Sequence, residues 1–126
     1  MPREPPVTDD TLSPMNLDVQ SDDIATSPTV SVLVLTYNHG PYVTRTLESI
    51  HQQVASFPFE VLVSEDCSTD DTRSRIEAFD RFVPGRHTLF LRNENVGAAA
   101  NLTDLLSAAT GRFVAIVEGD DYWTDP

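Results

Sequence analysis

The sequence predicts an α/β fold, an open and mostly parallel sheet with helices on its faces. Two observations lead to this prediction. Strand and helix patterns alternate from Pro28 onward with short connections, and right-handed crossovers turn that order into a parallel sheet. The first strand is apolar at nearly every position, which is typical of a strand buried on both faces.

The first strand and helix have the clearest patterns. Residues 30–36 are β-branched or apolar almost throughout and predict the strand. Residues 37–40 interrupt this run, and Pro41 suits the first turn of a helix, where its missing N–H costs nothing. An apolar stripe at helical spacing follows, formed by Val43, Leu47, Ile50 and Val54.

A second strand is predicted at 59–64, and a helix follows it. Ser68 or Thr69 can cap this helix, because a hydroxyl oxygen accepts hydrogen bonds from the free N–H groups of the first turn. Asp70 and Asp71 fall in that first turn, where carboxylates favour the positive end of the helix dipole. The apolar contacts of the helix are expected from Ile76, Phe79 and Phe82.

The second half of the chain continues the alternation. Residues 87–91 predict a third strand and residues 113–117 a fourth. Between them, apolar residues at i, i+3, i+4 and i+7 predict a helix that Gly111 ends. These residues are Leu102, Leu105, Leu106 and Ala109.

The first 27 residues differ from the rest. They contain four prolines, six acidic residues and one arginine, and they lack aromatic residues and any sustained apolar period. Such a segment buries too little surface to offset the entropy of ordering it, so residues 1–27 are predicted to be a disordered acidic tail. The folded domain is expected over residues 28–126.

The composition excludes several classes of protein. The chain has 126 residues, no lysine and a net charge of −12, which disfavours nucleic acid and anionic lipid as partners. No apolar run is long enough to cross a bilayer, and the N-terminus has no secretory pattern. Cys67 is the single cysteine, so the sequence predicts no intrachain disulfide and a cytoplasmic setting.

Polar residues follow three of the four predicted strands. They are residues 36–38 after the first strand, 65–66 after the second and 118–121 after the fourth. In open parallel sheets the ligand crevice lies beyond the carboxyl ends of the strands. The three groups are therefore expected to meet at one edge of the sheet.

Two features of this edge have competing interpretations. Residues 118–121 read Glu-Gly-Asp-Asp, which can hold a hard cation such as Mg²⁺ or Mn²⁺ through carboxylate oxygens, or can be a solvated acidic turn. Asp66 can accept hydrogen bonds from a ligand, or it can cap the following helix. Ser68 and Asp70 are the expected caps, which leaves Asp66 for a ligand.

Residues 93–101 form a small-residue entry into the third helix, where a phosphate could approach the helix N-terminus. The stretch lacks the glycine pattern of a Rossmann dinucleotide site, and the absence of lysine excludes a P-loop.

Taken in order, these motifs resemble the donor-binding half of family 2 glycosyltransferases, which have the GT-A fold. The resemblance extends from about residue 29 to residue 126. It is carried by the stretches VSVLVLTYN (30–38), VSEDCSTDDT (63–72), NVG (95–97), GRFVA (111–115) and EGDDYW (118–123).

The resemblance implies a nucleotide-diphosphate sugar as the donor, with UDP as the preferred nucleotide. It implies that Thr36 and Tyr37 line the base pocket, that Asn38 supports the loop and that Asp66 binds the base imide. Glu65 is placed beside Asp66 in the nucleotide site, and Asn101 near the base or phosphate. Asp120 would lie near the ribose and, with Asp121, hold Mn²⁺ or Mg²⁺. Glu118 replaces the first aspartate of the usual D-x-D pattern.

In the family, the acceptor site and the general base of inverting transfer come from sequence after the fourth-strand motif. The general base is therefore expected beyond Pro126, and no residue of this chain is expected to be catalytic. The chain is expected to be a donor-binding half truncated at its C-terminus. The implied acceptor is a glycan or a lipid-linked glycan at the inner face of the membrane. The sequence specifies neither the sugar nor an oligomeric state.

Two other functions are open. One is a non-catalytic module that keeps the fold as a nucleotide-binding or interaction surface. The other is a sugar nucleotidyltransferase, which would need a glycine-rich, basic loop after the first strand, where this chain has residues 37–40, Tyr-Asn-His-Gly.

Overall fold

Four parallel strands form the centre of the molecule. The computed structural model describes residues 27–83 and 85–125, so Pro126 and almost all of the predicted tail lie outside the described residues. The strands are β1 (Val30–Thr36), β2 (Phe59–Glu65), β3 (His87–Leu91) and β4 (Phe113–Glu118). They lie in the order β3-β2-β1-β4, with every neighbouring pair parallel. The predicted fold class and strand positions are confirmed.

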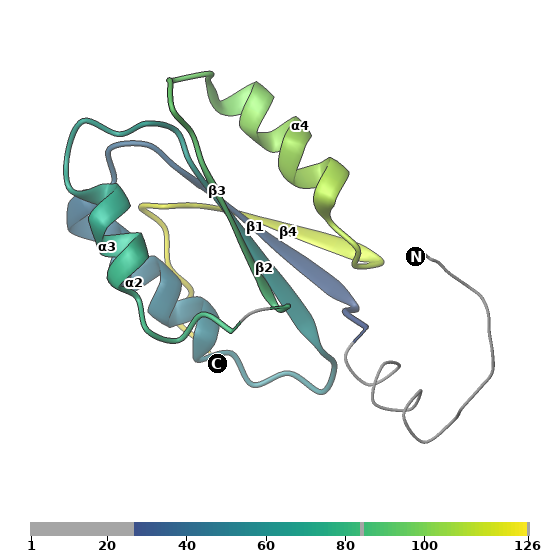
Figure 1. The fold of residues 1–126 in the computed structure, drawn as a ribbon. Coiled ribbons are helices and arrows are strands. Elements are labelled where there is room, and N and C mark those ends of the chain that lie inside the picture. Colours follow the sequence, from purple (N-terminus) through teal and green to yellow (C-terminus); the bar gives the residue numbers. More distant parts are fainter. Residues whose placement is uncertain (1–26, 84, 126) are drawn as a thin grey trace.

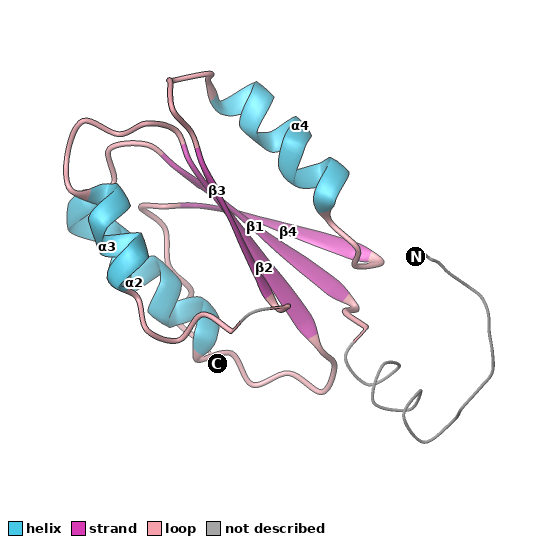
Figure 2. Ribbon diagram, in the orientation of Figure 1, coloured by secondary structure: helices cyan, strands magenta, loops and turns pink. Residues whose placement is uncertain are grey.

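Helices cover both faces of this sheet. The helices are α2 (Gly40–His51), α3 (Thr72–Ala78) and α4 (Ala98–Ala108). Helices α2 and α3 lie side by side on one face, and α4 lies alone on the other (Figure 1). The loops that leave the carboxyl ends of the strands gather at one edge (Figure 2). Each crossover connection returns the chain to the opposite end of the sheet, so all four strands run in the same direction and their polar carboxyl ends lie together.

The core has two layers, one on each face of the sheet. On the α2 face, Leu47 and Ile50 pack against Val32, Val34 and their neighbours, all of them buried. On the α4 face, Leu105 packs against the β1 and β2 side chains Leu33 and Leu62. Because successive side chains of β1 point to opposite faces, the continuous apolar run fills both layers.

Two residues of the predicted apolar stripes are not in the core. Helix α2 ends at His51, so Val54 lies beyond its last turn and is 82% exposed. Leu106 lies on α4 but points away from the sheet and is exposed. Helix α4 packs mainly on β1 and β2, and Val114 and Ile116 of β4 are exposed.

Helix α3 begins later than predicted. Its first residue is Thr72 and its N-cap is Asp71, which makes no side-chain capping hydrogen bond. The carboxylate of Asp70, the residue before the N-cap, accepts from the Thr72 N–H at 2.9 Å. Ser68 does not cap this helix, because its hydroxyl oxygen accepts from the Asn38 N–H at 2.8 Å. The prediction of Ser68 as a cap is therefore wrong, since its hydroxyl is hydrogen-bonded to a residue 30 positions away in sequence.

No helix within residues 27–83 and 85–125 has the length and hydropathy needed to cross a membrane.

Two histidines pair at the end of the sheet away from the strand carboxyl ends. His51 Nε2 and His87 Nε2 are 2.7 Å apart, and their rings stack with centroids 4.8 Å apart. The rings of Phe79 and Phe82 pack against His51. Burial, aided by the charges of His51 and Arg86, lowers the pKa of His87, although a backbone hydrogen bond to Val83 opposes this effect.

This pair predicts that mild acid destabilises the protein. A His87 pKa below its ordinary value of 6.5 means that the unfolded chain binds the proton more readily than the folded one. The contribution of neutral His87 to the free energy of unfolding is thus complete above pH 6.5, and it declines as the pH falls towards the lowered pKa. Urea denaturation at pH 7.5 and pH 5.5 should show lower stability at pH 5.5, and the difference should shrink in His87→Gln. An equal pH difference in both chains would contradict this prediction.

Candidate functional site

A cavity of about 350 Å³ opens at the carboxyl edge of the sheet. It lies where the ends of β1, β2 and β4 meet the N-terminus of α4. Its lining consists of Leu35, Thr36, Tyr37, His39, Ser64, Asp66, Asn95, Gly97, Ala98, Asn101 and Glu118. Four of the predicted site residues are in this lining, namely Thr36, Tyr37, Asp66 and Asn101. Parallel pairing of the strands has brought together residues from four separate segments of the sequence.

Asp66 is the most strongly held polar group of the cavity. It is 4% exposed, and its carboxylate accepts from Val96 N–H at 2.8 Å, Gly97 N–H at 2.9 Å and Asn95 Nδ2 at 3.0 Å. Burial raises the pKa of Asp66, but the Val96 N–H, the Asn101 side chain, the Gly97 N–H and the charge of Arg92 together outweigh burial, and the net pKa lies below the ordinary 3.8. Asp66 is therefore ionised at neutral pH and fixes the loop at 95–97.

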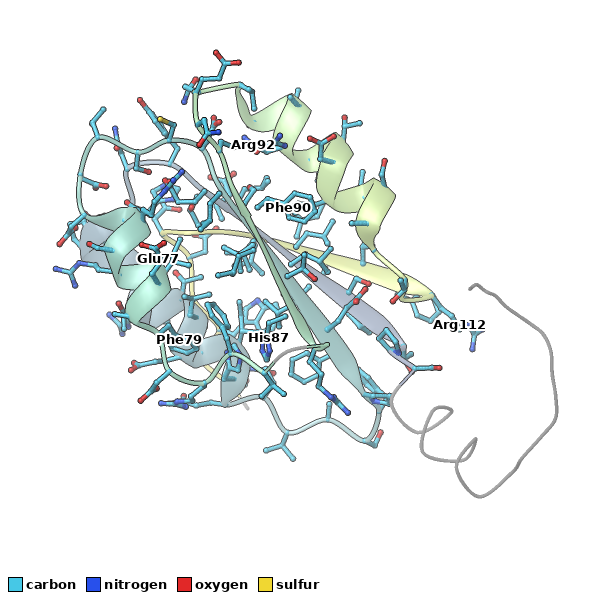
Figure 3. The ribbon with its side chains drawn as sticks, viewed as in Figure 1. Glu77, Phe79, His87, Phe90, Arg92 and Arg112 are labelled. Carbon is cyan, nitrogen blue, oxygen red and sulfur yellow. The ribbon has the colours of Figure 1, made fainter. Side chains whose placement is uncertain are left out.

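Asn101 is held in the cavity wall by two neighbours. It is 2% exposed, and its side-chain oxygen accepts from Arg92 Nε at 2.8 Å, while its Nδ2 donates to the Gly97 carbonyl at 2.8 Å. Arg92 also pairs with Asp104 of α4. Figure 3 shows Arg92 between the end of β3 and α4. Sequence reasoning missed Arg92, although a lone arginine directly after a predicted strand is a signal for it.

Glu65 does not line the cavity. Its side chain is wholly buried and accepts from Ser68 N–H at 2.9 Å and from Arg73 Nε at 2.8 Å. Arg73 also donates to the Arg92 carbonyl. Glu65 thus joins the end of β2 to α3 and to the end of β3, and it has no exposed surface to offer a ligand.

Thr36, Tyr37 and Asn38 have three different environments. Thr36 is buried and donates its hydroxyl to the Ser64 carbonyl at 2.8 Å, while Tyr37 is 42% exposed at the cavity. Asn38 lies outside the lining and has a φ of 53°, in the left-handed region that asparagine tolerates. Its side-chain oxygen accepts from Thr69 N–H at 2.8 Å, a contact that supports the loop.

The acidic turn after β4 is the most open part of this edge. Asp120 and Asp121 are exposed, and Asp120 Oδ2 lies 3.9 Å from His39 Nε2. Gly119 permits this approach, because a Cβ there would lie 2.6 Å from His39 Nδ1. Within residues 27–83 and 85–125, no three carboxylate, histidine or cysteine side chains are grouped to hold a metal ion. Sequence reasoning did not connect His39 with this turn.

The fold and the cavity define an α/β protein with its ligand crevice at the carboxyl ends of a parallel sheet. Residues 31–126 match the sequence model of glycosyl transferase family 2. The chain belongs to this family of glycosyltransferases, as the resemblance implied.

Relatives and solved structures agree with this assignment. The chain is 40% identical over 97 residues to an uncharacterised protein of Mycobacterium tuberculosis, and 37% identical over 97 residues to the putative teichuronic acid biosynthesis glycosyltransferase TuaG of Bacillus subtilis. These alignments cover 77% and 76% of the chain, but 28% and 37% of the two relatives.

Two solved structures share the fold. The Staphylococcus aureus TarS structure in complex with UDP has a TM-score of 0.64 and 36% identity, over 75% of this chain and 28% of that one. The mannosyltransferase PcManGT from Pyrobaculum calidifontis, in complex with GDP-Man and Mn²⁺, has a TM-score of 0.66 and 35% identity, over 76% and 28%. The matched part of the chain therefore spans well under a third of each of these two solved chains.

Proposed function

We propose that this chain is the donor-binding part of an inverting glycosyltransferase and that its cavity takes a nucleotide-diphosphate sugar. The observation that carries the proposal is the Asp66 carboxylate, held by three hydrogen bonds in a cavity at the carboxyl edge of the sheet. The nucleotide and nucleotide-sugar complexes of TarS and PcManGT, which share this fold, support it.

The hydrogen bonds of Asp66 favour a uracil base. An ionised carboxylate accepts about four hydrogen bonds. Asn95, Val96 and Gly97 already supply three donors, which leaves about one position for a ligand. The single imide N–H of uracil needs one position, whereas the ring N–H and amino group of guanine need two. A UDP-linked sugar is therefore the donor that we infer.

Asp120 and Asp121 are the residues that we assign to a divalent cation. Mg²⁺ and similar ions are often bound by one or two carboxylates and completed by substrate phosphates, so an exposed pair of carboxylates fits this chemistry without a third protein ligand. Such a cation would stabilise the charge that develops on the diphosphate leaving group. The chain has no lysine to hold that diphosphate, and we assign this role to a metal bound by these carboxylates.

The general base, the acceptor and the location complete the proposed function. Inverting transfer needs a general base for the acceptor hydroxyl, and we assign this role to none of the described residues. We infer a glycan or lipid-linked glycan as the acceptor, polysaccharide biosynthesis as the process, and the cytoplasm or the inner membrane face as the location.

Metal-dependent nucleotide binding is the test of this function. Calorimetric titration with UDP should show binding that strengthens when Mn²⁺ is added, and Asp121→Ala should remove the strengthening because it deletes a metal ligand. Asp80→Ala, which deletes a carboxylate just after α3 and away from the cavity, is the matched control and should bind as the parent chain does. If the folded parent chain binds no UDP with or without Mn²⁺, the donor-site assignment fails and a non-catalytic interaction module becomes the better description.

A further inference from the structure

Ser64 lies in the wall of the cavity, in a row of otherwise apolar side chains. It is on β2, paired in register with Leu35 of β1 and Phe90 of β3. Because strand side chains alternate, Ser64 faces the same side of the sheet as Leu62, which packs in the layer beneath α4. Ser64 and Asp66 are two residues apart, and both line the cavity.

The hydroxyl of Ser64 is buried without a partner. The residue is 1% exposed, and among the described residues its Oγ is the one buried side-chain oxygen or nitrogen that makes no hydrogen bond. Buried polar groups are nearly always hydrogen-bonded, because an unpaired one loses its contact with water and gains nothing in return. An apolar side chain would fill this position at lower cost. The orphan hydroxyl in a cavity wall therefore indicates a partner that arrives with the ligand.

We propose that Ser64 recognises the nucleobase. The Asp66 carboxylate accepts a hydrogen bond from the imide N–H of the base, and the Ser64 hydroxyl donates one to the carbonyl oxygen beside that N–H. This inference rests on the proposed nucleotide-sugar function and deepens it. Together the two side chains present one acceptor and one donor to the same edge of the base.

This pair specifies a chemical class of base. Uracil and guanine have a carbonyl next to a ring N–H, whereas cytosine and adenine have an amino group next to a bare ring nitrogen. A bare nitrogen would face the ionised carboxylate of Asp66, so cytosine and adenine are excluded on that side. Ser64 adds affinity for the bases in which a carbonyl stands beside a ring N–H, and the one free position on Asp66 favours uracil among them.

The test compares Ser64→Ala with the parent chain by titration with UDP and CDP in the presence of Mn²⁺. A hydrogen bond of ordinary net strength predicts that Ser64→Ala weakens UDP binding about two- to tenfold. CDP, whose bare ring nitrogen faces the Asp66 carboxylate, should bind weakly and equally to both chains, so the ratio of the UDP and CDP affinities narrows in the variant. The thermal midpoint without nucleotide should not fall, because the variant removes an unpaired hydroxyl. Ser107→Ala, at an exposed position of α4, is the matched control and should change neither quantity.

Three results would overturn the assignment, and they have different meanings. Equal UDP affinity in the parent and in Ser64→Ala would show that solvent satisfies the hydroxyl, while the proposed nucleotide function would stand. Equal losses for UDP and CDP with a lowered thermal midpoint would show a structural role in the wall. A parent chain that binds no UDP would overturn the proposed function itself, and the assignment of Ser64 with it.

Discussion

Replacing Asp66 with alanine is expected to lower the free energy of unfolding by about 3 kcal/mol and to abolish nucleotide binding. The carboxylate is nearly fully buried and receives the N–H groups of Val96 and Gly97 and the amide of Asn95. Its removal leaves these donors without their acceptor, and each buried donor left unpaired costs about 1–3 kcal/mol, reduced where water enters the open cavity. Urea denaturation measures the first effect and UDP titration the second.

Acid should produce part of the same loss in the parent chain. The lowered pKa of Asp66 means that the folded state keeps the carboxylate ionised below the ordinary pKa of 3.8. Its contribution to stability is therefore present above pH 3.8 and is lost as the pH falls through the lowered value. Asp66→Ala should show a smaller loss of stability over that range than the parent. A variant that unfolds at the same urea concentration as the parent would contradict the structural role of Asp66.

Replacing Arg73 with alanine is expected to lower the free energy of unfolding by about 2–3 kcal/mol. Removing one partner of a buried ion pair typically costs about 3–5 kcal/mol, because the remaining charge is left without compensation. Glu65 is wholly buried, whereas the Arg73 side chain is 33% exposed, which places this pair at or below the lower end of that range. Urea denaturation at neutral pH measures the loss.

A control and a second variant distinguish this pair from ordinary surface charges. Arg75→Ala removes an ion pair with Asp71 on the same helix, in which both side chains are about half exposed, and it should cost less than about 0.5 kcal/mol. Glu65→Gln removes the buried charge, so adding Arg73→Ala to it should cost much less than adding it to the parent. Equal losses for Arg73→Ala in both backgrounds would mean that the charge of Glu65 is not what Arg73 stabilises.

The role of Glu65 illustrates where reasoning from the sequence stops. Glu65 and Asp66 are adjacent carboxylates at the end of one strand, so their sequence context is nearly the same. Successive residues of a strand point to opposite faces of the sheet, and this alone gives the two carboxylates different surroundings. Asp66 faces the cavity beside α4, whereas Glu65 faces α3 and binds Arg73. The sequence contained the alternation, but it did not show which side held the cavity.

Local patterns determined most of the fold. The apolar run of β1, the proline at the start of α2 and the stripe on α4 depend on residues close together in the chain, and each element formed where it was predicted. The gathering of polar residues at one edge also followed from the sequence, because parallel strands must end on the same side. Errors arose at element ends, as at Val54, where a helix stops one turn before its pattern does.

Only the tertiary structure decided the hydrogen bonds that shape the site. Asp66 is fixed by residues 95–97, Asn101 by Arg92, and Asp120 lies beside His39 from a loop about 80 residues earlier. The hydroxyl of Ser64 has no partner because none of the side chains that pack around it in the folded chain offers one. The sequence alone determined the family and the edge of the sheet that carries the site. Which polar groups are already satisfied, and which are left for a ligand, depends on donors and acceptors that meet through long-range packing, and no local pattern records that pairing.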